Sequence, residues 1–415
     1  MTRTRIVGLL LAGLVVVSSR TRLLAAEGAD KLVKIVLGPS LSVPTEDSVH
    51  VWWNVNADVE DHYVEFGLTP SLGSKVTLEE KTQFPFLSLI GLERGKTYHY
   101  RVGTGEHKSE IFTFQLPDPE QSMRIVMWAD NQHGYEVFKE KTVPLALKLR
   151  PNFLLVPGDV VEMGFLYRDW RRDLYEPAAP LLRTVPWYPV RGNHDNNFPL
   201  AQRMMPLPGN NHWYARTYGS LRIVVLDTNL DYNPNSPQVE WLANELQGDA
   251  WRDASFRIVS FHHPPFNLIQ NRSNDDGDRL CREVLVPLLE EGGADFVICG
   301  HAHVYERGAR KRPDGRSTTY LVVGGGGGTL DNVRAGHWPH IDVSVQRHHV
   351  VVADVVRDKI TVRAIDSTNE KELDAFAVTG GPLAAKGKTQ LRQNPESKGK
   401  DRSNATLHAA KSAAP

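Results

Sequence analysis

From residue 122 to residue 378, short apolar segments are each followed within three residues by Asp, Asn or His. The segments have the length and the Val, Ile and Leu content of buried strands, at 124–128, 153–156, 222–226, 256–260 and 295–299. Helical stretches such as 237–246 and 281–290 lie between them. This alternation is typical of an α/β domain with layered sheets flanked by helices. Because ligands bind at the carboxyl ends of strands in such sheets, we expect the residues that follow the segments to meet in one crevice.

Five loops supply these residues. In chain order they contain Asp130 and Gln132, Gly158-Asp159, Gly192-Asn193-His194-Asp195, His262-His263, and Gly300-His301-Ala302-His303. Single motifs have ordinary alternatives, because a lone Asp can cap a helix and Gly-Asn-His-Asp can form an Asx turn. His301 and His303, separated by one residue and preceded by a buried strand, are harder to explain as a simple turn. The shared strand context favours a common metal site.

Residues 31–116 have a different pattern. Their short, evenly spaced strands show no helical period, and Val49, Val51, Trp53 and Val55 alternate with His50, Trp52 and Asn54. Such a pattern predicts an all-β sandwich. Prolines and acids at 116–120 indicate a linker. The region lacks a cluster of His, Asp or Cys at ligand spacing, so we expect it to be non-catalytic. The predicted fold is an N-terminal β-sandwich at 31–116 followed by an α/β domain at 122–378.

Both ends of the chain differ from this globular pattern. Residues 1–26 have a basic start, an apolar run from Ile6 to Val17 and small residues up to Ala26. This order predicts a cleaved signal peptide, with a membrane anchor as the alternative. The run is shorter than the roughly 20 apolar residues that span a bilayer. We therefore expect a secreted or periplasmic protein without stable membrane insertion. Residues 380–415 are polar and aperiodic, which predicts a disordered tail.

Charge and cysteine content exclude some classes of protein. Lys and Arg number 48 and Asp and Glu number 49, so the composition does not favour a nucleic-acid partner. With only Cys281 and Cys299, the chain is not a disulfide scaffold. Two buried thiols are the preferred interpretation, and a disulfide between them stays open.

The ordered motifs Gly158-Asp159, Gly192-Asn193-His194-Asp195, His262 and Gly300-His301-Ala302-His303 resemble the calcineurin-like metallophosphoesterase superfamily. The continuation Val304-Tyr305-Glu306-Arg307 looks most similar to the purple acid phosphatases. Those enzymes also carry an N-terminal sandwich, of the fibronectin type III-like kind. The resemblance thus implies a metal-dependent phosphoric ester hydrolase of the acid phosphatase type.

The resemblance implies two metal positions. Asp159 would bridge both ions, Asp130 and His303 would complete the first position, and Asn193, His262 and His301 would complete the second. Carboxylate, amide and imidazole ligands suit Fe, Mn or Zn. A hydroxide shared by the two ions would attack the phosphorus of a small phosphomonoester.

Further roles follow from the same resemblance. His194 would assist the leaving group, and Glu162 would form a hydrogen-bonded pair with His194. His263 and Arg307 are candidates for substrate binding, although Arg307 could equally be structural. The glycine run 324–328 is expected to form a tight turn near the site.

Two positions depart from the purple acid phosphatase pattern. Glu162 stands where those enzymes have a tyrosine ligand, and Gln132 stands where they have glycine. The wider superfamily often has a carboxylate at the first position and a histidine ligand at the second. We therefore expect no ferric tyrosinate, and Gln132 becomes a candidate ligand. A phosphodiesterase acting on nucleotides or lipid head groups, and a surface-binding protein with a degenerate site, are the alternatives.

Overall fold

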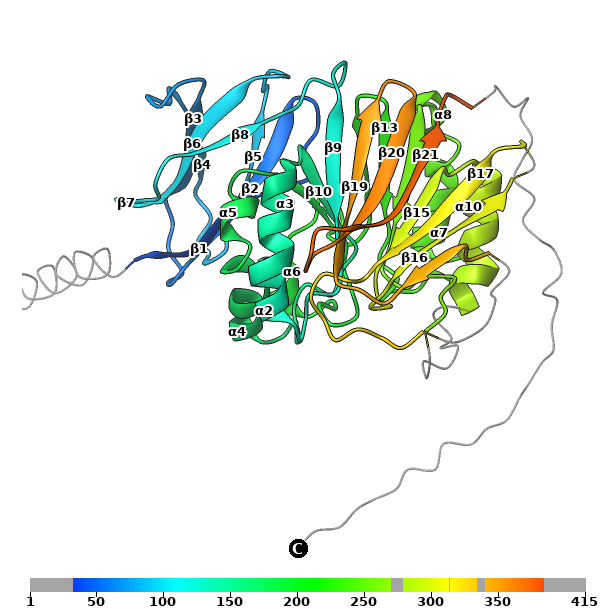
Figure 1. Cartoon of the computed structure of the whole chain (residues 1–415). Coiled ribbons are helices and arrows are strands. Elements are labelled where there is room, and N and C mark those ends of the chain that lie inside the picture. Colours follow the sequence, from blue (N-terminus) through cyan, green and yellow to red (C-terminus); the bar gives the residue numbers. More distant parts are fainter. Residues whose placement is uncertain (1–32, 270–278, 313, 334–339, 384–415) are drawn as a thin grey trace, which may run out of the picture. The chain divides into compact units, whose positions relative to one another are not determined.

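Buried runs of Val, Ile and Leu form the central strands, as their sequence predicts. The structure is a computed structural model that describes residues 33–269, 279–312, 314–333 and 340–383. The predicted signal peptide and nearly all of the predicted tail lie outside these residues. Within them, the structure has three sheets (Figure 1). No helix of the described residues is long and apolar enough to cross a membrane.

The largest sheet has nine strands, and both ends of the described chain contribute to it. In spatial order it contains β21 (Glu372–Thr379), β20 (Lys359–Asp366), β19 (His349–Val356), β9 (Met123–Met127), β10 (Phe153–Val156), β11 (Trp187–Pro189), β1 (Ile35–Ser42), β2 (Ser48–Val55) and β5 (Phe86–Ile90). Strands β9, β10 and β11 are parallel to one another. Their carboxyl ends therefore lie at one edge.

A second sheet has seven strands. Its order is β12 (Tyr214–Tyr218), β13 (Leu221–Val225), β14 (Phe256–Ser260), β15 (Phe296–Cys299), β17 (Ser317–Val323), β16 (Tyr305–Lys311) and β18 (Val343–Val345). Strands β13, β14, β15 and β17 are parallel. These strands and those of the nine-stranded sheet include all the apolar segments predicted from the sequence.

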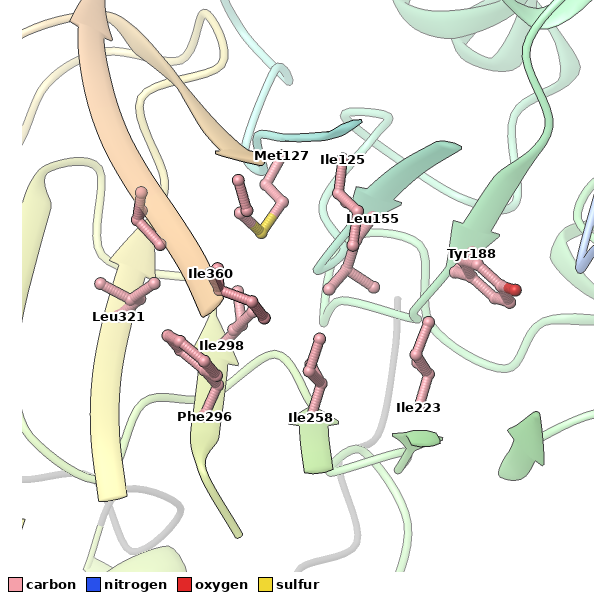
Figure 2. Close-up of a pocket in the computed structure, with 12 residues that line it drawn as sticks. Ile125, Met127, Leu155, Tyr188, Ile223, Ile258, Phe296, Ile298, Leu321 and Ile360 are labelled. Atoms are coloured by element: carbon pink, nitrogen blue, oxygen red, sulfur yellow. The ribbon is translucent and has the colours of Figure 1, made fainter. Parts of the chain in front are cut away.

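The two sheets pack face to face through apolar side chains. Figure 2 shows Ile125, Leu155 and Tyr188 of the nine-stranded sheet on one side, with Ile223 and Ile258 of the seven-stranded sheet on the other. Because the backbone groups of the central strands pair along the ladders of their own sheets, apolar side chains can fill the space between the sheets. This core holds the strands whose loops carry the predicted ligands.

Helices cover the outer faces of both sheets. The nine-stranded sheet packs against a helical run of α2 (Tyr135–Val137), η1 (Phe138–Thr142) and α3 (Val143–Leu149), with α4 (Tyr167–Asp169), η2 (Trp170–Tyr175), α5 (Ala179–Leu182) and α6 (Pro199–Met204). The other sheet packs against α7 (Pro237–Glu245), α8 (Asp249–Asp253), η3 (Cys281–Leu285) and α10 (Val286–Gly292). The predicted α/β layering is thus confirmed. Cys281 and Cys299 are buried thiols and form no disulfide.

The N-terminal region is a sandwich that shares a sheet with the rest of the molecule. A third sheet, β4 (Ser74–Leu78), β3 (His62–Gly67), β6 (Thr97–Thr104) and β7 (His107–Lys108), with β8 (Phe112–Gln115) on β6, packs on β1, β2 and β5. Val49, Val51 and Trp53 of β2 face this core, as their alternation predicts. Trp52 faces the other way, into the core of the α/β region, and its indole Nε1 donates to the Arg203 carbonyl at 2.8 Å. The two regions are therefore structurally interdependent.

Candidate metal centre

The two central sheets each supply part of the predicted ligand set. Loops after β9, β10 and β11 carry Asp130 with Gln132, Asp159 and Asn193, whereas loops after β14 and β15 carry His262, His301 and His303. Most of these side chains are buried. Carboxylate and imidazole atoms of Asp130, Asp159 and His262 lie within 4.8 Å of one another, as do imidazole atoms of His262, His263 and His301. The structure thus brings the predicted ligands together.

Asp159 lies at the middle of the cluster. His262 Nε2 is 3.1 Å from Asp159 Oδ2, and Gln132 Nε2 is 3.3 Å from the same oxygen. The other oxygen, Oδ1, accepts the backbone N–H of His194 at 2.8 Å. Burial by itself raises the pKa of Asp159, but the His262 imidazole outweighs it and the pKa is lowered. Burial lowers the pKa of His262, and Asp159 outweighs that to raise it to about 9.

Asp130 and His303 form one side of the cluster. Asp130 Oδ2 accepts the backbone N–H of His301 at 2.8 Å, and Oδ1 lies 3.6 Å from His303 Nε2. His303 Nδ1 donates to the Thr329 carbonyl at 2.6 Å, which fixes the tautomer and leaves Nε2 facing Asp130. Asp130 therefore places one oxygen, and His303 one nitrogen, at the predicted first metal position.

Asn193 and two histidines form the other side. Asn193 Oδ1 lies 2.8 Å from His301 Nδ1 and 3.1 Å from His262 Nε2. His262 Nδ1 donates to the Pro157 carbonyl at 2.7 Å, so Nε2 faces Asp159 and Asn193. These are the three residues predicted for the second metal position, and they converge as a metal site requires.

The chemistry of this donor set fits a cation. Asp130 Oδ1 and Gln132 Oε1 are buried and have no hydrogen-bond partner, and an orphaned buried oxygen is costly. Gln132 Nε2 lies 3.1 Å from His303 Nε2. Since the oxygen and nitrogen of an amide are assigned from their surroundings, turning the Gln132 amide would bring its oxygen to the cluster. The residues present are thus suited to bind metal, and Gln132 stays a candidate ligand.

Glycines permit the loops to approach this closely. A Cβ atom on Gly192 would lie 2.0 Å from Asp159 Oδ1, and one on Gly324 would lie 2.0 Å from the Ala302 carbonyl. The glycine run 324–328 hydrogen-bonds to the first ligand loop, because Gly328 N–H donates to the Asp130 carbonyl at 2.8 Å. The run therefore packs against the Asp130 and His303 loops, next to the site as predicted.

Asp195, the last residue of the Gly-Asn-His-Asp motif, organises two of the loops. Its fully buried carboxylate accepts the backbone N–H groups of Asp159 (2.9 Å), Val160 (2.9 Å) and Gly192 (2.8 Å). Burial and the adjacent Asp159 carboxylate raise the pKa of Asp195 to about 7, and the backbone amides oppose this rise. The sequence interpretation gave this residue no role, although its place in the motif was the available signal.

Glu162 and His194 are hydrogen-bonded as predicted, but the bond does not involve the Glu162 carboxylate, so the predicted carboxylate–imidazole pair is wrong. His194 Nδ1 donates to the backbone carbonyl of Glu162 at 2.7 Å. The Glu162 carboxylate instead lies 2.6 Å from Nδ1 of His133, a residue that the motif search missed. His133 follows Gln132 directly and has a left-handed backbone (φ 60°), which turns its ring toward Glu162. Ligand atoms of His133, Glu162 and His194 lie within 4.8 Å of one another beside the metal-ligand cluster.

The two predicted substrate-binding residues have different surroundings. The His263 ring lies 4.6 Å from that of His301, and its Nδ1 is 2.7 Å from Thr228 Oγ1. Substrate contact by His263 stays a prediction. Arg307 Nε instead donates to Asp374 Oδ2 on β21 at 2.6 Å, and its guanidinium stacks 4.9 Å from the Phe376 ring. These contacts support the structural alternative for Arg307, and its contact with substrate stays a prediction.

Comparisons with known proteins agree with this geometry. Residues 123–305 match the profile of the calcineurin-like phosphoesterase family. Purple acid phosphatase 18 of Arabidopsis thaliana is 25% identical over 315 residues, which are 69% of this chain and 70% of that protein. The structure of purple acid phosphatase PPD1 from yellow lupin (Lupinus luteus) seeds aligns with a TM-score of 0.71 at 19% identity, over 82% of this chain and 74% of that chain. The structure of PhoD aligns with a TM-score of 0.61 at 17% identity, over 82% and 90%. The two structural likenesses concern the fold.

Proposed function

We propose that this chain, which carries a calcineurin-like phosphoesterase domain at residues 123–305 and has purple acid phosphatases among its relatives, hydrolyses small phosphomonoesters with two metal ions. The observation that carries the proposal is the convergence of the five ligand loops, with Asp130 Oδ1 left buried and without a hydrogen bond. Such an oxygen, surrounded by imidazole nitrogens and a second carboxylate, is suited to a cation.

The donor atoms divide into two sets that share Asp159. Asp130 and His303, with Gln132 nearby, would hold one ion. Asn193, His262 and His301 would hold the other, and Asp159 would contact both. Two such ions, when bound, lower the pKa of a shared water and neutralise phosphate oxygens. Fe, Mn and Zn each suit this mixture of oxygen and nitrogen ligands.

We propose that His194 assists the leaving group. Its backbone N–H holds Asp159 Oδ1, and its ring Nδ1–H is held by the Glu162 carbonyl. Because Nδ1 donates to this carbonyl, a proton for the departing alkoxide would come from Nε2 of the imidazolium form, which leaves the neutral ring with its Nδ1–H bond to Glu162 intact. Replacing His194 with alanine should therefore lower kcat more for esters of poor leaving groups than for esters of good ones.

A hydrolysis screen tests the assignment. Pure protein loaded with Mn, Zn or Fe would be assayed on phosphate mono- and diesters across pH, with metal content measured in parallel. We expect about two metal equivalents and a preference for monoesters. Preferred cleavage of nucleotide or lipid diesters would show that the chain is a phosphodiesterase rather than a phosphomonoesterase. Absence of bound metal and of turnover would support a degenerate binding protein.

We also propose that the protein is exported through residues 1–26. The support is the sequence of that segment, with its basic start, apolar run and small residues before Glu27. Mass spectrometry of the protein from the medium or periplasm of an expressing cell should find a mature chain starting at Glu27. Full-length protein retained in the cytosol would contradict export.

A further inference from the structure

Two exposed phenylalanine rings pack against each other on the loops that hold His194. Phe165 is 51% exposed and Phe198 is 37% exposed, and their ring centroids lie 5.2 Å apart at an interplanar angle of 77°. Met163, on the same loop as Phe165, is 41% exposed. Single exposed apolar residues are ordinary, but adjoining ones at a surface commonly mark a binding site.

The rings belong to the same loops as the candidate catalytic groups. Phe165 lies three residues after Glu162, whose carbonyl accepts from the His194 ring. Phe198 lies four residues after His194. The two loops are joined directly, because the backbone N–H of Gly164 donates to the His194 carbonyl at 2.9 Å. The aromatic pair is therefore connected through short stretches of backbone to His194, the residue proposed to assist the leaving group.

The loop that presents Phe165 is firmly held. A Cβ atom on Gly164 would lie 1.8 Å from the Asp195 carbonyl, so the two backbones are in direct contact. The fully buried Trp170 donates from Nε1 to the Gly164 carbonyl at 2.9 Å. The Phe165 ring is thus exposed on an ordered turn rather than on a loose one. A preordered aromatic surface loses little conformational entropy when a ligand packs on it.

We propose that Phe165 and Phe198 form a subsite that receives an aromatic leaving group of the ester held at the metal-ligand cluster. The proposal rests on the proposed phosphatase function and narrows its substrates to esters of aromatic or aryl-bearing alcohols. An aromatic ring of the substrate would pack on the exposed faces of the pair while His194 faces the ester oxygen. The paired rings offer the edge and face contacts that a third ring prefers.

The test compares benzyl phosphate with methyl phosphate, because both leave as primary alkoxides and differ mainly in the ring. In Phe165→Ala and Phe198→Ala, kcat/KM for benzyl phosphate should fall by about 5- to 10-fold relative to methyl phosphate, which is the size expected of one aromatic contact. The change should lie in KM, because the contact is the same in the ground state and the transition state. Ile90→Ala is the matched control, since Ile90 is 72% exposed on β5; it should leave the ratio unchanged.

A binding measurement separates this subsite from the proposed function. Titration of metal-loaded protein with benzylphosphonate and methylphosphonate should show tighter binding of the benzyl compound, and each Phe→Ala variant should remove that difference. If the protein does not hydrolyse phosphomonoesters but still binds benzylphosphonate more tightly than methylphosphonate, the proposed phosphatase function is wrong and the proposed subsite stands. If both Phe variants hydrolyse the esters with an unchanged ratio of kcat/KM for benzyl phosphate to kcat/KM for methyl phosphate, the proposed subsite is wrong and the proposed phosphatase function stands.

Discussion

The contact between Gly192 and Asp159 allows a sharp test of how the metal centre is built. In Gly192→Ala, the added Cβ would start 2.0 Å from Asp159 Oδ1 and 2.3 Å from the Asp159 backbone N. Ordinary contact begins near 3.4 Å, so the two loops must separate by about 1.4 Å. Neither neighbour is the end of a flexible side chain, because Asp159 is fully enclosed and its Oδ1 accepts from His194. The Asp159 carboxylate, which we propose contacts both ions, must therefore move.

A displacement of this size should weaken metal binding strongly, whereas its cost to folding stability should be modest. Ligand distances in metal sites vary by only about 0.2 Å, so a carboxylate moved by more than 1 Å no longer fits both positions. We expect metal affinity to fall by at least about 10- to 100-fold, as when groups that orient metal ligands are lost. Overpacking should cost about 1–3 kcal/mol, below the roughly 5–15 kcal/mol that stabilises a typical domain.

The assay is metal binding by folded protein. Circular dichroism and denaturant titration would establish that Gly192→Ala is folded, and titration with Zn or Mn would give its affinity and stoichiometry. Gly248→Ala is the matched control, since its φ is −68° and the nearest atom to its Cβ would be the Glu245 carbonyl at 3.3 Å. The reasoning fails if Gly192→Ala binds two ions with wild-type affinity and keeps wild-type kcat.

Three further outcomes follow from the site and its surroundings. Asp159→Ala should lose both ions and at least about 10³-fold in kcat, measured by metal analysis and steady-state kinetics, if one carboxylate serves both positions as proposed. Iron-loaded protein should show no strong visible charge-transfer band in its absorption spectrum, because Glu162 replaces the tyrosine ligand; a strong band would show that another tyrosine binds iron. Burial raises the pKa of Glu306 to about 7. The folded state therefore holds a proton that the unfolded chain releases near pH 4.3, and the unfolding free energy should fall by about 2 kcal/mol as pH rises from about 5 to 7. Glu306→Gln should flatten that slope in denaturant titrations.

The contacts of the neighbouring tyrosines agree with the expectation that no tyrosinate binds iron. Tyr167 and Tyr175 are near the Glu162 loop in sequence, yet both hydroxyl groups have other partners. Tyr167 donates to Asn54 Oδ1 at 2.6 Å, and the Tyr175 hydroxyl bonds the Met204 carbonyl. Neither hydroxyl is therefore available to the cluster in this structure, so the tyrosine position of the purple enzymes is not refilled by a neighbour.

Local pattern was enough to predict the strands and the convergence of the ligands. A run such as Phe153–Val156 is buried on every side, and its apolar sequence shows this without long-range information. Parallel strands place their following loops at one edge, so Asp159 and Asn193 had to be neighbours once β10 and β11 paired. The order of the strands and the chemical type of each residue predicted a shared site, whereas the division of the ligands between two metal positions came from the family resemblance.

Long-range pairing could not be predicted in the same way. The chain from β9 to β11 lies in one sheet and the chain from β13 to β17 in another, although both stretches have the same alternating pattern. Strand β1 meets β11 through a single pair, Ser42 with Trp187, which no local period encodes. The linker at 116–120 suggested two separate domains, whereas Trp52 packs in the core that supports the metal site. The burial of a residue from one region in the core of another depends on the tertiary fold and is not visible in the local sequence.

Glu162 shows why a correct choice of residue can still miss the interaction. Sequence reasoning compares side chains, and a carboxylate three residues after Asp159 suggested a partner for His194. The loop instead places the Glu162 carbonyl against His194 Nδ1, a bond that any residue at this position could make. The carboxylate is then able to reach His133, whose left-handed backbone turns its ring back toward the site. The orientation of His194 thus depends on the path of the backbone, which Gly164 and Asp195 fix, and the side chain at position 162 can vary among relatives without losing it.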